Sequence, residues 1–178
     1  MPVSSNDFTV SSYRSTGANT NCSCEQMMPL SNDAPATISR LLNMGVEPFL
    51  ITASVNLVLA QRLARKICSD CKAPAPKVDP EFMKTMGLTP EQIAKAQVMK
   101  GTGCRTCNGS GYKGRVALYE VMRFSESLKD MVLQGGSTAE LKAAAIKGGM
   151  VTLRASGILK VLAGVTTPEE VSRVTMAD

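Results

Sequence analysis

The sequence contains no histidine and no tryptophan, and only 4% of its 178 residues are aromatic. Without histidine, an ordinary protein zinc site can be built only from cysteine thiolates. The scarcity of aromatic rings argues against nucleic-acid binding, because base stacking needs aromatic side chains among the basic ones. The most apolar stretch, residues 49–64, is interrupted by polar residues and falls short of the about 18 apolar residues of a membrane-spanning helix. We therefore expect neither a nucleic-acid partner nor direct membrane insertion.

Four of the six cysteines form two C-x-x-C pairs, Cys68 with Cys71 and Cys104 with Cys107. This spacing lets two thiolates turn toward one metal ion, and four such sulfurs complete a tetrahedral zinc site at about 2.3 Å each. The 32 residues between the pairs exceed the roughly 15–20 of a short zinc ribbon, so this stretch should carry structure of its own. The pattern predicts a structural Zn²⁺ bound by all four cysteines.

Two other interpretations of the cysteine pairs stay open: a redox dithiol of the thioredoxin type, and unliganded thiols or a disulfide. A redox motif normally occurs once and opens a helix after a strand. No secretory signal is apparent, which favours a reducing compartment and argues against disulfides. Four thiolates leave no open coordination position, so we expect no catalytic residue at this centre. Cys22 and Cys24 lie in a polar leader and are interpreted as incidental.

Basic residues gather around the cysteine pairs, where they would partly offset the charge of −2 on a zinc ion held by four thiolates. These residues are Arg62, Arg65, Lys66, Lys72, Arg105, Lys113 and Arg115. Contact with a phosphate group or an acidic partner is the alternative interpretation.

Local signals predict an α/β chain that is mostly helical. Residues 1–29 lack apolar periodicity and are expected to be disordered or an unrelated leader. Asp33 or Asn32 should cap the first helix, with Pro35 in its first turn. Strands are expected from about residue 56 to the first cysteine and over residues 115–124. Further helices should begin near Pro48, Pro80, Thr89, Ser125, Ser137, Thr152 and Thr167.

Several segments together resemble the C-terminal end of the type II secretion and type IV pilus assembly ATPases, with the pilus assembly branch the nearer. They are residues 32–35 (NDAP), 61–63 (QRL), both cysteine pairs, 109–115 (GSGYKGR), 119–121 (YEV) and the tail GM-x-TLR at 149–154. The resemblance covers roughly residues 31–178. It implies a cytoplasmic hexameric motor, peripheral to the bacterial inner membrane, that hydrolyses ATP and acts on pilin through an inner-membrane platform protein.

The same resemblance implies an organisation along the chain. Residues 30–67 would be the C-terminal piece of a RecA-like core, and residues 68–114 an inserted tetracysteine zinc subdomain. Residues 115–178 would form a strand and a C-terminal helical bundle.

The chain also departs from the family. The phosphate-binding loop G-x-x-x-x-G-K-[ST] occurs nowhere in it, and Leu30 stands where the family usually has a histidine. We therefore expect an incomplete, catalytically silent chain with no cofactor-binding residues for ATP, whereas ATP and Mg²⁺ belong to the intact parent motor.

Two alternatives have different functions. One is a free-standing zinc-dependent scaffold that binds motor subunits or the platform protein. The other is a chaperone-like zinc module, because residues 104–111 match the C-x-x-C-x-G-x-G repeat of J-type cochaperones, although that repeat occurs four times there and once here.

Overall fold

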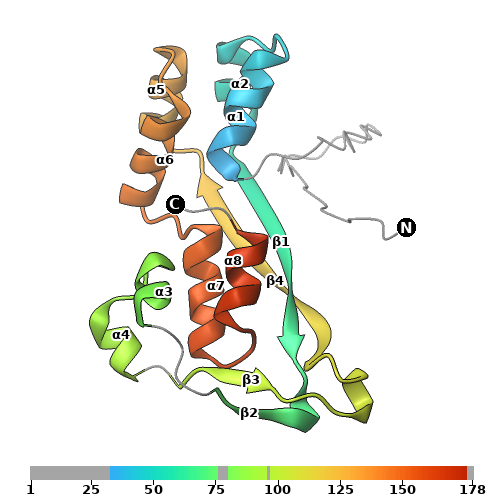
Figure 1. Ribbon diagram of the computed structural model, residues 1–178. Helices are drawn as coiled ribbons and strands as arrows, with labels where there is room; N and C mark the ends of the chain where they lie inside the picture. Colours follow the sequence, from blue (N-terminus) through green and yellow to red (C-terminus); the bar gives the residue numbers. More distant parts are fainter. Residues whose placement is uncertain (1–32, 76–79, 96, 176–178) are drawn as a thin grey trace. The chain divides into compact units, whose positions relative to one another are not determined.

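The computed structural model describes residues 33–75, 80–95 and 97–175 (Figure 1). Within these ranges the chain forms helices and two small two-stranded sheets, β1 with β4 and β2 with β3. This mixture agrees with the expected α/β class. Contacts divide the chain into two compact units, each built from distant segments. Unit 1 holds residues up to Gln61 and Tyr119–Thr152; unit 2 holds Arg62–Leu118 and residues from Leu153 onward. The predictions for residues 1–29, Cys22 and Cys24 lie outside the described residues.

Unit 1 combines helices with the adjoining ends of two strands. Its helices α1 and α2 pack against α6 and α5, respectively. The buried residues Val58, Ala60 and Met122 alternate with more exposed ones along the strands, as expected for a sheet with one covered face. The elements are α1 (Ala34–Asn43), α2 (Pro48–Ser54), α5 (Glu126–Leu133), α6 (Thr138–Lys147), the start of β1 (Leu57–Ile67) and the end of β4 (Tyr112–Arg123).

Two carboxylates satisfy the start of α1. The side chain of Asp33 accepts the Ala36 N–H at 2.9 Å, which confirms Asp33 as the predicted cap. The buried Glu120 on β4 accepts the Ala34 N–H at 2.6 Å. Negative charge is favourable here because the first N–H groups of a helix have no partner inside it and carry partial positive charge. Glu120 thereby fixes the first helix to the strand.

The other helix starts in unit 1 follow the sequence signals to different degrees. The predicted capping box of α6 is confirmed: Ser137 Oγ accepts the Glu140 N–H at 3.3 Å, and Glu140 Oε2 accepts the Ser137 N–H at 2.8 Å. Helix α5 begins after Ser125 as predicted, but the Ser125 hydroxyl pairs with Ser127 Oγ at 3.0 Å instead of capping the helix.

Unit 2 has an aliphatic core shared between the stretch separating the cysteine pairs and the last two helices. Met83, Met86 and Leu88 from the first region are buried with Ile158, Val161 and Val171 from the second. Gly157 allows close approach of α7 to α8, because a Cβ at this position would overlap the Val171 side chain. The elements are β2 (Lys72–Pro74), α3 (Pro80–Thr85), α4 (Pro90–Lys95), β3 (Met99–Gly101), α7 (Leu153–Leu162) and α8 (Pro168–Val174).

The two long strands lead into and out of the cysteine region. Strand β1 ends at Ile67, next to the first cysteine, which confirms the predicted strand. Strand β4 begins at Tyr112, three residues before the predicted start. The earlier start follows from Gly111, whose φ of +75° completes the preceding turn and returns the chain to an extended conformation.

The helices are short. The longest ones, α1, α6 and α7, have 10 residues each. Among the described residues, no helix combines the length and the apolar composition needed to cross a membrane.

Candidate metal centre

Pairing of two short strands brings the cysteine pairs together. Each pair lies in a 3-10 turn, Ser69–Cys71 in the first and Arg105–Cys107 in the second. Strand β2 follows the first turn and β3 precedes the second, and they pair antiparallel with Lys72 opposite Gly101 and Pro74 opposite Met99. Because the strands are held in register, cysteines 36 residues apart meet.

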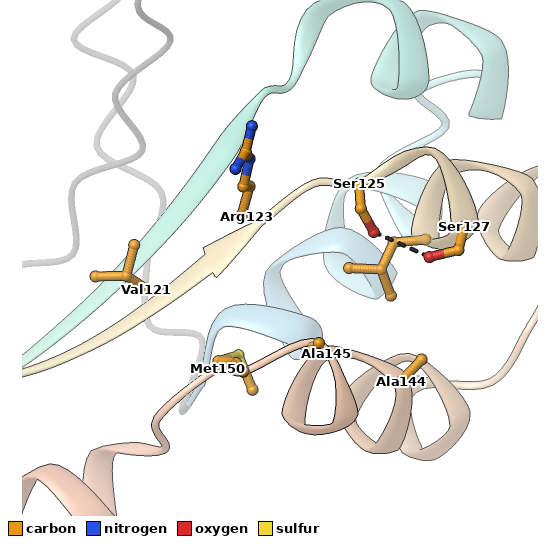
Figure 2. A pocket seen from close by; sticks show the side chains of 10 residues that line it. Val121, Arg123, Ser125, Ser127, Ala144, Ala145 and Met150 are labelled. Atoms are coloured by element: carbon orange, nitrogen blue, oxygen red, sulfur yellow. Dashed lines mark hydrogen bonds between the residues drawn. The ribbon is translucent and has the colours of Figure 1, made fainter.

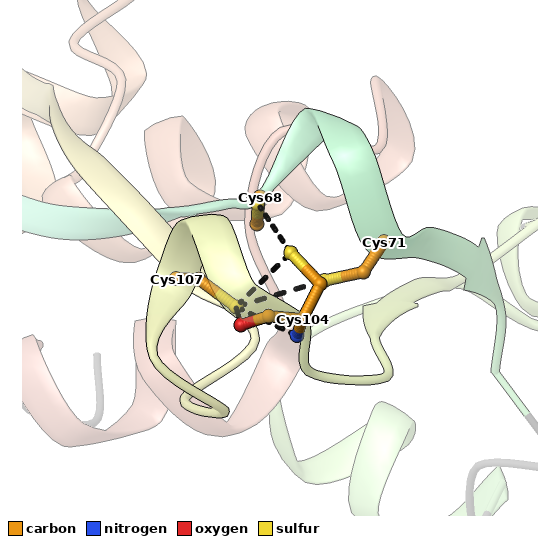
Figure 3. Close-up of side chains that lie close together, drawn as sticks. All are labelled: Cys68, Cys71, Cys104 and Cys107. Carbon is orange, nitrogen blue, oxygen red and sulfur yellow. Dashed lines mark hydrogen bonds between the residues drawn. The ribbon is translucent and has the colours of Figure 1, made fainter.

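All four sulfur atoms converge on one point, as Figure 3 shows. The Sγ–Sγ distances are 3.8 Å for Cys68–Cys104, 3.8 Å for Cys71–Cys107 and 3.7 Å for Cys104–Cys107, and all four atoms lie within 4.8 Å of one another. A tetrahedron with zinc–sulfur bonds of about 2.3 Å has edges of about 3.8 Å. The residues present therefore fit a tetrahedral thiolate-bound ion.

The separations also bear on the other interpretations. A disulfide needs sulfur atoms about 2.05 Å apart, and these cysteines are free thiols. Neither C-x-x-C pair opens an α-helix, since each sits in a three-residue 3-10 turn. The arrangement is therefore unlike the thioredoxin-type dithiol and favours a shared metal ion.

Backbone N–H groups support three of the four sulfurs, those of Cys71, Cys104 and Cys107. The N–H groups of Cys104 and Gly111 both donate to Cys107 Sγ at 3.2 Å. These hydrogen bonds lower the pKa of Cys107 to about 6 despite its burial. Burial raises the pKa of Cys71 to about 11, which the Gly103 N–H offsets only in part. Because a metal binds thiolates, loading this centre must release protons, and metal affinity should rise with pH.

Glycines let the backbone close around the centre. At Gly111, a Cβ would lie 2.6 Å from the carbonyl oxygen of Gly101, and at Gly103 (φ +92°) it would lie 2.7 Å from the carbonyl oxygen of Gly109. Gly111 also accepts the Cys68 N–H through its carbonyl at 3.0 Å. Glycine is needed at residues 103 and 111 because two stretches of backbone pass too close there for side chains.

A cluster of charged and polar side chains joins the centre to α8. Arg65 stacks over the Tyr112 ring with its guanidinium carbon 4.4 Å from the ring centroid, and it pairs with Glu170 at 2.8 Å. Arg173 pairs with the same carboxylate at 2.6 Å, and Tyr112 Oη lies 2.9 Å from Thr167 Oγ1. Of the basic residues singled out in the sequence, Arg65 therefore has a specific structural partner next to the cysteines.

Glu170, Arg173 and Tyr112 were not among the residues predicted to belong to the centre. Glu170 was recognised only as part of a helix start, where its N–H does donate to Thr167 Oγ1 at 3.3 Å. Its carboxylate instead meets Arg65, 105 residues earlier. No local sequence signal indicates a pairing across that separation.

Unit 1 contains a hollow of its own (Figure 2). It lies where β4 ends, α5 begins and α6 ends, and it contains none of the predicted site residues. It is lined by Val121, Arg123, Ser125, Ser127, Leu128, Ala144, Ala145, Gly148, Gly149 and Met150. The two serine hydroxyls bond each other, and Arg123 supplies the one ionisable side chain of the lining.

Comparisons with known proteins agree with the resemblance noted above. The family described as "Type II/IV secretion system protein" matches residues 30–173. The type IV pilus assembly ATPase PilB of Myxococcus xanthus is 54% identical over 148 residues, covering 83% of this chain and 26% of that protein. PilB of Thermus thermophilus is 45% identical over 141 residues, covering 79% and 16%, respectively. Type II secretion system protein E of Pectobacterium carotovorum is 43% identical over 146 residues, covering 82% and 28%. The chain thus spans about a quarter of the length of most such relatives.

Replacing Gly111 by alanine should weaken the centre more than replacing Gly109. Both glycines have φ +75°, so both substitutions carry the same left-handed strain of about 1–2 kcal/mol. At Gly109 a Cβ meets nothing within 4 Å, whereas at Gly111 it meets the Gly101 backbone. We expect G111A to lose roughly 1–3 kcal/mol more than G109A in chelator-competition and unfolding measurements. Equal losses in the two variants would show that the close backbone approach is unimportant.

Glu170 should make the free energy of unfolding depend on pH in the acid range. Burial alone would raise the pKa of Glu170, but hydrogen bonds from Arg173 and Arg65 outweigh it and lower the pKa to about 2. Since the pKa is below its unfolded value, the stabilisation is fully present above about pH 4.5 and disappears as the pH falls toward 2. It should amount to about 2 kcal/mol after allowance for the solvent-exposed arginines.

The measurement is the free energy of unfolding of wild type and E170Q from pH 7 to pH 2. The difference between the two proteins should shrink as the pH falls from about 4.5 to 2. The same substitution at Glu140, E140Q, is the matched control. Hydrogen bonds from Ser137 also lower the pKa of Glu140, but Glu140 lies on an exposed helix start. A difference for E170Q that is independent of pH would refute the ion cluster as its cause.

Proposed function

The chain belongs to the type II/IV secretion system protein family, and from this membership we propose that it forms the zinc-bearing C-terminal part of a motor ATPase for pilin polymerisation or protein secretion. The family match extends over residues 30–173, and the similar proteins named above are pilus assembly ATPases and a type II secretion protein E. Because the chain spans about a quarter of their length, the activity of a whole motor is a proposal for it.

The proposed organisation follows the sequence. Residues 30–67 would be the C-terminal piece of a RecA-like core, residues 68–114 the zinc subdomain, and residues 115–178 a strand and helical bundle. The proposal places the protein in the cytoplasm, peripheral to the inner membrane. Its partners would be other motor subunits in a ring and the membrane platform protein.

The convergence of four thiols carries the metal assignment. Cys68, Cys71, Cys104 and Cys107 would hold one Zn²⁺, whose bonds would join strand β1 to the turn before β4. Zinc fits better than a hard cation such as Mg²⁺, because thiolates are soft ligands. With four sulfurs bound, the ion has no open position for water, so its role would be structural.

We expect this chain to lack groups that ATP hydrolysis needs. Phosphoryl transfer requires a phosphate cradle, a carboxylate that holds magnesium and a group that orients water. No G-x-x-x-x-G-K-[ST] loop occurs in this sequence. In the proposed motor these groups would come from other parts of a complete subunit, and this region would supply the metal-stabilised end of the core.

A free-standing zinc-dependent scaffold is the second candidate function. The observation that favours it is the contrast between a complete set of four metal ligands and the lack of a phosphate-binding loop in the same sequence. Such a scaffold would bind motor subunits or the platform protein without turning over ATP.

Metal analysis should find one zinc per chain, unchanged when Cys22 and Cys24 are both replaced by serine. The C104S variant should lose the metal, because three thiolates and a neutral hydroxyl cannot complete the site. Metal binding contributes about 10–16 kcal/mol to folding of small zinc-finger peptides, so hydrogen exchange should rise from about residue 66 to residue 115. Helices α5 and α6, which belong to unit 1, should keep their protection. Zinc lost from the Cys22/Cys24 variant would contradict the assignment.

Residues 1–178 alone should neither bind nor hydrolyse ATP. Calorimetry with magnesium-ATP and a phosphate-release assay should both show no signal at any protein concentration, since the sequence has no G-x-x-x-x-G-K-[ST] loop to fix the γ-phosphate. A saturable affinity in the micromolar range would contradict the proposed division of labour and indicate an unrecognised nucleotide site. The scaffold alternative would be favoured instead if the zinc-loaded chain bound the platform protein without any other part of a motor.

A further inference from the structure

Cys104 is the least buried of the four cysteines. It is only partly buried, whereas the exposed fractions of Cys68, Cys107 and Cys71 are 0%, 7% and 9%. Its sulfur accepts the backbone N–H of Cys107, whereas the Cys107 sulfur accepts two N–H groups, from Cys104 and Gly111. Access to a ligand sulfur is therefore greatest at Cys104.

Accessibility bears on reactivity. A zinc-bound thiolate keeps nucleophilic character, and reaction with an electrophile requires access to the sulfur lone pair. Burial blocks approach of the electrophile, and each N–H bond draws electron density from the sulfur. Burial protects Cys68, Cys71 and Cys107 more than Cys104, and the two N–H bonds protect Cys107 further.

We propose that Cys104 is the oxidation-sensitive position of this centre, where a peroxide attacks first, and that a disulfide between Cys104 and Cys107 then forms and releases the zinc. The inference rests on the zinc site proposed above. It assigns different roles to four ligands that look equivalent in the sequence.

The chemistry balances with a peroxide as the oxidant. The Cys104 thiolate attacks one oxygen of hydrogen peroxide, the O–O bond breaks, and sulfenic acid and hydroxide form. The Cys107 thiolate then attacks the Cys104 sulfur, a disulfide forms, and a second hydroxide leaves. The two sulfurs lose two electrons and the peroxide gains them. Zinc keeps only Cys68 and Cys71 as protein ligands.

Cys107 is the expected partner because the turn already folds these two residues together. Their sulfurs are 3.7 Å apart, the Cys104 N–H donates to Cys107 Sγ at 3.2 Å, and Cys107 Sγ lies 3.4 Å from the Cys104 carbonyl oxygen. A bond between them closes a C-x-x-C ring within one turn. The Cys68 sulfur is 3.8 Å from that of Cys104, but a bond between them would instead join two separate turns, one before β2 and one after β3.

Release of the metal should loosen a defined set of contacts. The Gly111 N–H donates to Cys107 Sγ, and the Gly111 carbonyl accepts the Cys68 N–H. The next residue, Tyr112, contacts Arg65 and Thr167. Oxidation at Cys104 would thus change the connection between the cysteine turns and α8 within unit 2.

The test uses the full chain with Cys22 and Cys24 replaced by serine, after its zinc content has been measured. The protein is treated with substoichiometric N-ethylmaleimide in one arm and hydrogen peroxide in the other. Released zinc is read with a chromogenic chelator, and modified cysteines are mapped by mass spectrometry. In the first arm Cys104 should be the first residue alkylated. In the second arm one zinc should be lost for each Cys104–Cys107 disulfide formed.

A control variant tests whether a substitution near the turn by itself changes the order of cysteine reactivity. G109A adds a methyl group beside the same turn without a close contact, so the order of cysteine reactivity should stay the same. Zinc-loaded protein that is alkylated first at another cysteine, or that forms a disulfide from Cys68, would overturn this inference and leave the zinc site standing. Protein that carries no zinc would overturn the site and the inference together.

Discussion

The convergence of four thiols within one small volume is the constraint on which the rest of unit 2 depends. Four thiolates repel one another, and without a cation they would not share a site. The structure prepares the site by pairing β2 with β3 and by passing two stretches of backbone so close that only glycine fits at residues 101, 103 and 111. N–H groups directed at the Cys107 sulfur provide partial positive charge. The metal would therefore complete an arrangement that the backbone already favours.

Two buried carboxylates play comparable parts, one in each unit. Glu120 in unit 1 accepts the first N–H of α1, and Glu170 in unit 2 lies between Arg65 and Arg173. Both are 1% exposed. A buried charge is costly unless it is hydrogen-bonded, so each of these side chains fixes the position of the element that supplies its partner. For Glu170 this element is strand β1 immediately before the first cysteine.

Relationship to the secretion and pilus motors gives these local features a context. The match covers nearly all of the described residues, and the cluster of four cysteines lies inside it. The four sulfurs are unequal in burial and hydrogen bonding, although the sequence presents them as two similar pairs. That inequality is a property of the fold, and it bears on how the centre would respond to metal and to oxidants.

The sequence by itself determined the features whose cause is local. The C-x-x-C spacing, the cap at Asp33, the capping box from Ser137 to Glu140 and the strand leading to Cys68 all depend on residues a few positions apart. Only the tertiary structure decided which residues distant in sequence meet. It placed the carbonyl of Gly101 against Gly111 and the carboxylate of Glu170 against Arg65. Hydrogen bonds and close contacts depend on distances of a few ångströms, and only the packing of the folded chain sets such distances between residues far apart in the sequence.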